Sequence, residues 1–292
     1  MRLISTLLVS FMLFSGFSHA SAQSSSSCTT TIITVNATGN VTPLGINASN
    51  TVVGTFFDSG FASHGFIWSS GAGRLYDFPG ATGTQLAGIN DQGVAVGTFF
   101  NDDGSSSGFT LDKNGQTSQF SVPAAFNTVA NGINNRGNVV GVWQAFEADT
   151  FTGFEKTGNT FTTIQFPGAV NTLPIAITDA GVIAGTYFDG NSSHGFINVN
   201  GRFVSIDFPG AASTEVRGMN DRGELVGEFR QTADSQGQGF TFKDGQFTSF
   251  QFPGSTFTEL SGVNAQGDRV GDAVTSNNDG FLSGPGFLLT CH

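Results

Sequence analysis

The sequence predicts an all-β fold: a six-bladed β-propeller of four-stranded blades, with the ring closed by the N-terminal strand. Three observations predict it: a 17-residue frame that recurs six times, four strand-like runs in each copy, and chain ends that complement each other. Composition agrees, since 292 residues with 41 glycines and 31 phenylalanines are rich in turn formers and in large apolar side chains.

The frame is centred on the tripeptide Gly-Ile-Asn, whose copies or close variants recur at steps of 43, 44, 44, 42 and 44 residues. These copies begin at Gly45, Gly88, Gly132, Ala176, Gly218 and Gly262. A second glycine, the frame glycine, follows nine residues after each start, and a triplet resembling Phe-Pro-Gly ends eight residues before it. A constant period of this length is typical of propellers and other repeat architectures.

Each copy contains four runs with strand character, which in the second copy read TQLAGIN, VAVGTFF, SGFTLD and QTSQFSV. The first two runs are joined by NDQG, a sequence that favours a type I turn followed by a left-handed residue. We therefore interpret the asparagine of the frame as a turn-starter and not as a ligand. The frame glycine is expected where adjacent blades approach each other. A stacked solenoid is the alternative, but it would need capping repeats at both ends.

The two ends of the chain explain the two cysteines. The sixth copy stops after its third strand, while the run TTTIIT precedes the first copy without a blade of its own. Aligning the copies places Cys291 and Cys28 on Asp244 and Gly245, which are neighbours in a hairpin turn. We expect residues 29–35 to complete the sixth blade, and a Cys28–Cys291 disulfide to replace that turn.

Residues 1–22 have the pattern of a secretory signal peptide, with Arg2, an apolar run and a small-residue site at Ala20-Ser21-Ala22. Residues 23–292 then form a single propeller domain. We expect a secreted protein, extracellular or periplasmic, in which a disulfide persists and which does not insert into a membrane once the signal is removed. A net charge of −11 argues against nucleic acid as a partner, and a monomer is expected.

The repeat read at 45–68, and more weakly at 176–196, resembles the HAF repeat of predicted bacterial extracellular proteins. That family is named for a His-Ala-Phe triplet, which is His-Gly-Phe here in two copies, at His64 and His194. The other copies have Ser107, Thr152, Gln238 and Pro285 at the histidine position. The resemblance implies export and a repeat architecture, and it brings no catalytic residues.

Metal binding has two candidates in the sequence. His64 and His194 belong to opposite blades, too far apart to share a zinc ion, so each is expected to bond the backbone of its own loop. Loops with Asp102, Asp103, Asp189 and Asp279 lack the spacing of a calcium-binding loop, and turn chemistry explains them. We predict no metal site and no cofactor, with calcium as the alternative.

The strand nearest the axis carries the candidate site. At its second position the copies have Thr42, Gln85, Val129, Leu173, Glu215 and Glu259, and two residues later Leu44, Ala87, Asn131, Ile175, Arg217 and Ser261. Charge therefore gathers on the fifth and sixth blades. We interpret Arg217 and Glu259 as an ion pair, with a polar ligand site formed by Glu215, Arg217, Glu259 and Ser261 as the sharper hypothesis.

The longest loop between second and third strands, at 272–286, lies beside this cluster. No nucleophile with its base, phosphate loop or zinc signature is present, so no catalytic residue is predicted. The expected function is an exported binding or scaffold module for an extracellular saccharide or protein. The alternative is an extracellular glycan hydrolase or lyase that uses Glu215 and Glu259.

Overall fold

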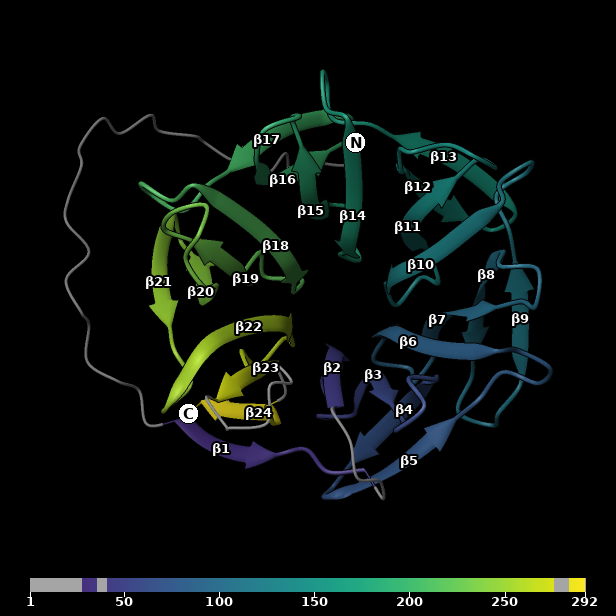
Figure 1. The fold of residues 1–292 in the computed structure, drawn as a ribbon, viewed down its shortest axis with the longest axis horizontal. Helices are drawn as coiled ribbons and strands as arrows, with labels where there is room; N and C mark the ends of the chain where they lie inside the picture. Colours follow the sequence, from purple (N-terminus) through teal and green to yellow (C-terminus); the bar gives the residue numbers. More distant parts are fainter. Residues whose placement is uncertain (1–27, 36–40, 276–283, 292) are drawn as a thin grey trace, which may run out of the picture.

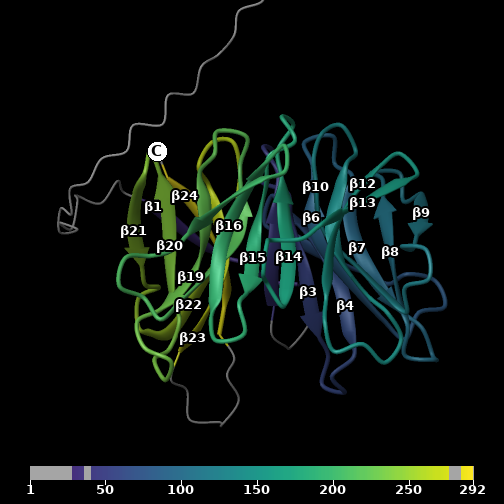
Figure 2. The same ribbon diagram turned by 90° about the horizontal axis from the view of Figure 1, so that it is seen from above.

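The computed structural model describes residues 28–35, 41–275 and 284–291. Every regular element in these ranges is a β-strand, and the sheets stand around a central axis, as in a β-propeller (Figure 1). Seen from the side, the sheets form one ring whose inner strands run roughly along its axis (Figure 2). Within these ranges no helix is long and apolar enough to cross a membrane. The predicted all-β propeller fold is confirmed, while the predicted signal peptide lies outside the described residues.

Four of the five sheets have four antiparallel strands each. The first contains β2 (Val41–Ile46), β3 (Val52–Phe57), β4 (Ser63–Ser69) and β5 (Ala72–Tyr76). The second contains β14 (Asn171–Ile177), β15 (Ile183–Phe188), β16 (Ser193–Val199) and β17 (Arg202–Ile206). The third contains β18 (Ser213–Met219), β19 (Leu225–Arg230), β20 (Gln238–Lys243) and β21 (Gln246–Phe250). The closing sheet contains β22 (Ser255–Val263), β23 (Arg269–Thr275), β24 (Gly286–Cys291) and β1 (Cys28–Ile32).

The remaining sheet has eight strands in two antiparallel halves. One half contains β6 (Gly83–Ile89), β7 (Ala95–Phe100), β8 (Ser106–Leu111) and β9 (Thr117–Phe120). The other contains β10 (Asn127–Ile133), β11 (Val139–Gln144), β12 (Thr152–Thr157) and β13 (Thr160–Ile164). A single parallel pair, Asn127 with Ser106, joins the halves.

Phenylalanine fills the space between neighbouring sheets. The third strand of each copy contributes one ring that is at most 1% exposed: Phe66, Phe109, Phe154, Phe196, Phe240 and Phe287. The phenylalanine of the Phe-Pro-Gly triplet stacks on an aromatic ring of the next copy, as Phe208 does on Phe229 with ring centroids 3.6 Å apart. The phenylalanines of the third strands are therefore core residues, and the triplet phenylalanines, which are half-buried, pack against them.

The asparagine of the frame starts the turn between the first two strands. In Asn134 the side-chain oxygen accepts hydrogen bonds from the backbone N–H groups of Arg136 and Asn138, at 3.0 and 2.9 Å. Its amide also donates to the carbonyl oxygen of Thr178 in the next copy, at 2.9 Å. The turn-starting role is confirmed, and a link between neighbouring copies, which the sequence did not reveal, is added to it.

The frame glycine and the glycine that begins the tripeptide have different roles, and the role predicted for the frame glycine belongs to the other one. A Cβ on the frame glycine Gly227 would lie 1.9 Å from the carbonyl oxygen of Glu215 on the paired strand, where the β18–β19 register shifts. A Cβ on Gly218, the first residue of the tripeptide, would lie 2.9 Å from the carbonyl oxygen of Ser261 in the next sheet. The prediction that the frame glycine permits sheets to approach was therefore wrong. It accommodates a bulge within its own sheet, and the other glycine permits the approach.

The N-terminal strand β1 closes the ring. It pairs antiparallel with β24, so that Cys28 lies opposite Cys291, and the two cysteines form a disulfide. At the aligned place in the neighbouring sheet, Asp244 and Gly245 form the tight turn between β20 and β21, both with positive φ. The predicted disulfide is confirmed at the predicted place.

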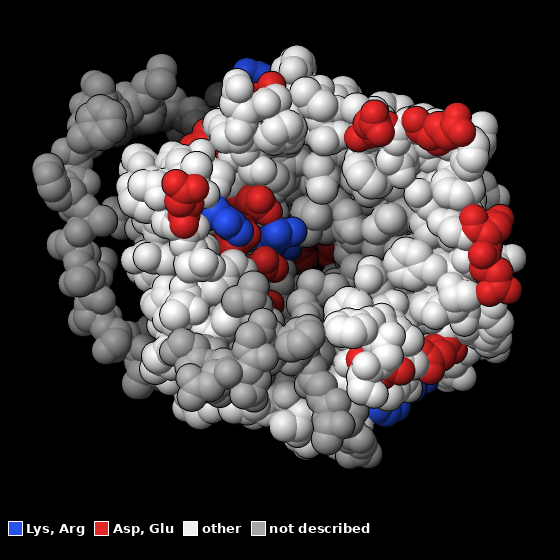
Figure 3. Space-filling view, viewed as in Figure 1, with Lys and Arg blue, Asp and Glu red and all other residues white. Residues whose placement is uncertain are grey.

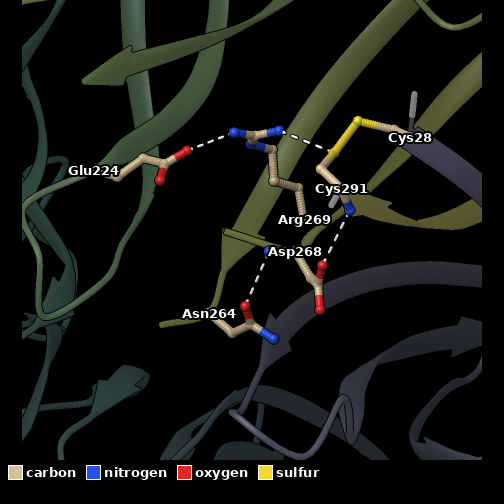
Figure 4. Close-up of a disulfide and its surroundings, with 6 residues drawn as sticks. All are labelled: Cys28, Glu224, Asn264, Asp268, Arg269 and Cys291. Atoms are coloured by element: carbon tan, nitrogen blue, oxygen red, sulfur yellow. Dashed lines mark hydrogen bonds and ion pairs between the residues drawn. A yellow bond between two sulfur atoms is a disulfide. The ribbon is translucent and has the colours of Figure 1, made fainter. Parts of the chain in front are cut away.

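Polar side chains surround this disulfide (Figure 4). Arg269 on β23 donates to the sulfur of Cys291 and to Glu224, which comes from the turn between β18 and β19. Asp268 accepts a hydrogen bond from the backbone N–H of Cys291 at 3.2 Å. The covalent closure is thus bonded to the neighbouring sheet as well as to its own.

Candidate functional site: a carboxylate cluster at the axial channel

Strand β18 presents two charged side chains to the axis because strand side chains alternate between faces. Thr214 and Val216 are buried between sheets, whereas the side chains of Glu215 and Arg217 are 26% and 34% exposed. Arg217 lines an axial cavity of about 90 Å³ together with Leu44, Ala87, Asn131, Ile175 and Ser261. Figure 3 shows acidic and basic side chains gathered beside the central hollow, over β18 and β22.

Arg217 is the centre of the cluster. Its Nη2 atom lies 2.7 Å from Oε2 of Glu215, 3.5 Å from Oε2 of Glu259 and 3.7 Å from Oε1 of Glu228. The ion pair predicted between Arg217 and Glu259 is present, and the shortest contact is the one to Glu215 on the same strand. Three carboxylates from two sheets therefore converge on one guanidinium.

Two members of the cluster lie on the second strand of their sheets and cannot be found from the innermost strand alone. Glu228 on β19 lies opposite Glu215, and Asp272 on β23 lies opposite Glu259. Each directly follows the frame glycine of its copy. The other copies have Thr55, Thr98, Val142 and Thr186 at this position. The residue after the frame glycine was thus a signal available in the sequence, and both missed carboxylates occur in the two copies already singled out.

The pKa values of three carboxyl groups in the cluster, those of Glu228, Glu259 and Asp272, are raised. Burial raises the pKa of Glu228 to about 7, with the charges of Glu259 and Glu215 adding to the effect and Arg217 opposing it. Burial also raises the pKa of Asp272 to about 7, with Glu259 and Glu228 adding to it. The pKa of Glu259 is raised by burial, against the effect of Arg217. Glu228 and Asp272 therefore gain and lose protons near neutral pH.

Two polar atoms in the cluster have no hydrogen-bond partner in the described structure. They are the buried Oε2 of Glu228, an acceptor, and the buried Nε of Arg217, a donor. Gly237, in the loop between β19 and β20, packs against the Glu228 carboxylate, and a Cβ there would lie 2.1 Å from Oε2. Unpaired buried polar atoms are uncommon in folded proteins, and two of the four in the described residues belong to this cluster.

Ser261, the fourth residue of the predicted site, has a structural contact. It is 2% exposed, and its hydroxyl donates to the carbonyl oxygen of Pro43 on the first sheet. The hydroxyl therefore links β22 to β2. The predicted long loop beside the cluster falls largely on residues 276–283, which lie outside the described residues, as does Asp279.

The two histidines belong to separate sheets and repeat one arrangement. His64 lies 2.7 Å from Asp77 and 3.5 Å from Asp58, and His194 lies 3.0 Å from Asp207 and 3.5 Å from Asp189. Their partners are thus carboxylates, not the loop backbone as predicted.

Desolvation lowers the pKa of the His64 imidazole, but Asp77 and Asp58 together raise it above its ordinary value. In the part of the chain that the structure describes, no three His, Cys, Asp or Glu side chains are arranged to hold a metal ion.

Two of the acidic loops considered for calcium, those of Asp103 and Asp189, use a carboxylate within their own turn. Oδ1 of Asp189 accepts from the N–H groups of Asn191 and Ser192. Asp103 accepts in the same way from the backbone and hydroxyl of Ser105. These contacts agree with the turn chemistry expected from the sequence.

Comparisons with known proteins support the fold. No protein-family model matches the sequence, and the search of curated proteins gives no match. Among solved structures, TolB from Agrobacterium tumefaciens is 11% identical, with a TM-score of 0.57, covering 72% of this chain and 80% of that one. AofleA from Arthrobotrys oligospora is 12% identical, with a TM-score of 0.54, covering 86% and 84%.

A lectin is also similar in structure. A mutant of the Aleuria aurantia lectin, in complex with the disaccharide Fucα1-6GlcNAc, is 11% identical, with a TM-score of 0.51. The match covers 86% of this chain and 94% of the lectin chain. At such low identity these similarities establish a propeller-like all-β fold, and the chemistry of the site has to be argued from its own residues.

Proposed function

We propose that this chain is an exported six-bladed β-propeller that acts as a binding or scaffold module. The blade count rests on treating the two halves of the eight-stranded sheet as separate blades, since one residue pair joins them. Six copies of the frame in the sequence support the same count. Export is supported by the disulfide, because such bonds persist in oxidising compartments. Membership in the HAF-repeat family and a monomeric state remain predictions.

One observation carries the binding role. In each of the six copies, one residue of the innermost strand lies opposite the residue that follows the frame glycine. Both residues of this pair have carboxylate side chains in two neighbouring copies only: Glu215 with Glu228, and Glu259 with Asp272. The other four copies form their sheets without such a carboxylate pair, so the fold does not require the cluster. Clusters of this kind at the mouth of a rigid scaffold are typical of ligand sites. We assign the ligand contacts to Glu215, Arg217 and Glu259.

The test is a binding array of glycans and extracellular proteins, probed with the purified chain from residue 23 onwards. Saccharides are included because a structurally similar lectin binds a disaccharide. Arg217→Ala and Glu259→Gln should each weaken binding at least tenfold. Their controls are Gln85→Ala, at the position equivalent to Glu215 and Glu259 on another side of the axis, and Arg202→Ala on β17, which lies outside the cluster. Equal binding by all four variants would place the ligand elsewhere.

A hydrolase or lyase acting on an extracellular glycan is the second candidate. It is favoured by the raised pKa of Glu228 and Asp272, since carboxyl groups titrating near 7 can donate protons at neutral pH beside other carboxylates. Release of new sugar ends from a polysaccharide panel, lost in both Glu215→Gln and Glu259→Gln, would establish this activity. An inactive wild-type chain that still binds its glycan would exclude it for that glycan.

A further inference from the structure

A serine, a histidine and an aspartate form a hydrogen-bonded series in the sheet of β14 to β17. Oγ of Ser192, directly before β16, lies 2.9 Å from Nε2 of His194, and Nδ1 of His194 lies 3.0 Å from Oδ1 of Asp207. Asp207 directly follows β17, the strand that pairs with β16, so the fold brings it to the histidine. A hydroxyl, an imidazole and a carboxylate in this order are the parts of the triads that transfer acyl groups.

The carboxylate of Asp207 determines where the protons of the imidazole lie. A carboxylate only accepts hydrogen bonds, so Nδ1 of His194 donates to Asp207 and the neutral ring offers the lone pair of Nε2 to the hydroxyl of Ser192. Tyr187 stacks on the imidazole with ring centroids 5.1 Å apart, and the Tyr187 hydroxyl lies 2.9 Å from that of Ser205. The imidazole is therefore held in the tautomer and orientation that a general base for Ser192 requires.

The first copy of the repeat has the same pair without the serine. His64 lies 2.7 Å from Asp77, but Ala62 has the place that Ser192 has in the fourth copy. The backbone N–H of Ala62 donates to the aspartate of its own loop at 2.9 Å, the same distance as for the N–H of Ser192. Since the two loops hold this residue in the same way, the sheet forms without the hydroxyl.

The second copy has the serine without the histidine. Ser105 there lies two residues before the histidine position, which is Ser107, and the Ser105 hydroxyl donates to Asp103 at 2.6 Å. The remaining copies have Thr152, Gln238 and Pro285 at the histidine position. The fourth copy is thus the only one whose sequence combines the hydroxyl with the imidazole, and its serine hydroxyl lies against the imidazole instead of a carboxylate.

The series is accessible from solvent. Ser192 is half-buried, and the side chains of His194 and Asp207 are 25% and 44% exposed. Val170, an exposed apolar residue, borders the same loop, because a Cβ on Gly190 would lie 3.7 Å from its Cγ2 atom. Its apolar surface suits a short acyl chain, and an open site sets no limit on the size of the alcohol that carries the chain. The substrate class that fits is a short-chain acyl ester.

We propose that Ser192 is the nucleophile of an ester hydrolase, with His194 as general base and Asp207 as its positioning residue. Oγ of Ser192 attacks the carbonyl carbon of the ester while its proton passes to Nε2 of His194. The bond from that carbon to the alcohol oxygen breaks, and the alcohol leaves with the proton. Water then attacks the acyl-serine and gives a proton to His194, the carboxylic acid leaves, and the proton returns to Oγ.

The imidazolium that forms in each step has a second carboxylate beside it. Oδ2 of Asp189 lies 3.5 Å from Nε2 of His194, and Oδ1 of the same residue is fixed by the N–H groups of Asn191 and Ser192. A negative charge at this distance stabilises the protonated ring as the serine proton arrives. This activity is independent of the ligand proposed for the carboxylate cluster at the axis, which lies on other residues.

Two probes test the inference on the purified chain: p-nitrophenyl acetate, and a fluorophosphonate that phosphonylates nucleophilic serines. Peptide mapping should place the phosphonate on Ser192. Ser192→Ala and His194→Gln should each abolish this label and lower ester hydrolysis at least about tenfold. Both variants are expected to fold, because Ala62 and Gln238 are the natural residues at the corresponding positions of other copies, and thermal unfolding checks this.

Asp207→Asn tests the positioning role. It should lower kcat at least about fivefold and leave KM within about twofold, since Asp207 orients the base and does not contact the ester. His64→Gln and Ser193→Ala should change neither constant, which separates Ser192 from the general reactivity of surface imidazoles toward activated esters. Equal hydrolysis by Ser192→Ala and the wild type, or a phosphonate label on another residue, would overturn the inference.

Discussion

Arg269 donates a hydrogen bond from Nη1 to the sulfur of Cys291 across 3.4 Å, so that a cation of β23 lies against the disulfide (Figure 4). Its Nη2 lies 2.6 Å from Glu224, a carboxylate that is 4% exposed and comes from the neighbouring sheet. Arg269 therefore links the disulfide to the interface with the neighbouring sheet. Loss of the disulfide should weaken the Arg269–Glu224 contact, and loss of that contact should weaken the packing around the disulfide.

The double substitution Cys28→Ser and Cys291→Ser should lower the free energy of unfolding by up to about 5 kcal/mol, since the bridge joins cysteines 263 residues apart. Denaturant unfolding of the variant and of the reduced wild-type chain should agree, because both lack the crosslink. Peptide mapping without reductant should recover the linked pair. Two free thiols in the oxidatively folded protein would contradict this assignment.

Removing residues 1–36 should destabilise the protein, whereas removing residues 1–22 should not. The longer deletion takes away β1 and leaves β24 as an unpaired strand edge, a surface prone to association. Light scattering after size exclusion and thermal unfolding measure the two effects. A shorter chain that stays monomeric and unfolds at the wild-type temperature would show that β1 does not close the ring.

Replacing Asn134 should separate its two roles. Asn134→Ala loses the turn bonds and the link to Thr178, at a cost of about 1–3 kcal/mol. Asn134→Thr should cost less, because Thr178, the natural residue at this position in the fourth copy, still accepts from the N–H of Val182 at 3.0 Å. Chemical unfolding measures both. Wild-type stability in Asn134→Thr would mean that the link between copies contributes nothing.

The reciprocal substitution Thr178→Asn should raise the melting temperature, since it supplies the amide donor that this copy lacks. The neighbouring amides provide the template, as Asn220 donates to the carbonyl oxygen of Asn264 at 2.9 Å. Calorimetry beside Asn134→Ala, whose melting temperature should fall, gives the comparison. An unchanged or lower value in Thr178→Asn would count against the role assigned to the amide.

The contribution of Glu228 and Asp272 to stability should fall as pH rises from about 4 to about 7. Glu228 and Asp272 have pKa values of about 7 in the folded protein, against 4.5 and 3.8 for the free groups, so the folded state binds more protons in that window. Their contribution is fully present at low pH and is lost as pH rises through 7. Glu228→Gln should remove the pH-dependent contribution of Glu228. At pH 8 the free energy of unfolding of the variant should therefore exceed that of the wild type by on the order of 2 kcal/mol.

At pH 4 the same variant should match the wild type. Glu155→Gln, on β12 outside the cluster, serves as its control. Urea unfolding at several pH values supplies the measurement, read as the difference between variant and wild type. A difference independent of pH would show that Glu228 does not titrate in this window.

Much of the fold could be predicted because local residues in each repeat determine where its turns and strands lie. Asn134 and Gly137 mark a turn of fixed length, so the strands on either side and their register follow. The ends of the chain could be joined because Cys28 and Cys291 align with adjacent turn residues of another copy. Which glycine meets the neighbouring sheet could not be deduced, because the clash at Gly227 arises from a bulge that only the backbone shows.

The candidate site was predicted in part for a similar reason. Glu215, Arg217 and Glu259 stand on strands expected to line the axis, and their alternation placed them on one face. Glu228 and Asp272 were missed because their proximity depends on pairing with the second strand. The contact of Ser261 with Pro43 joins the last copy to the first, a relationship that spans 218 residues and leaves no local pattern.

The hydrogen bonds donated by the frame asparagines all run in the same direction around the ring. Each amide donates forward, from Asn47 to Asn90, from Asn90 to Asn134 and from Asn134 to Thr178, and Asn264 donates back to Asn47 at 3.2 Å. Five asparagines donate to the next copy in this way, and Thr178 interrupts the circle, so these bonds do not by themselves fix where the chain begins. The position of the termini is then a choice of where to cut, and the cysteines mark that cut. A circular permutant that joins the present ends and opens the link near Gly168 should rebuild the same ring, with its seam moved to another copy.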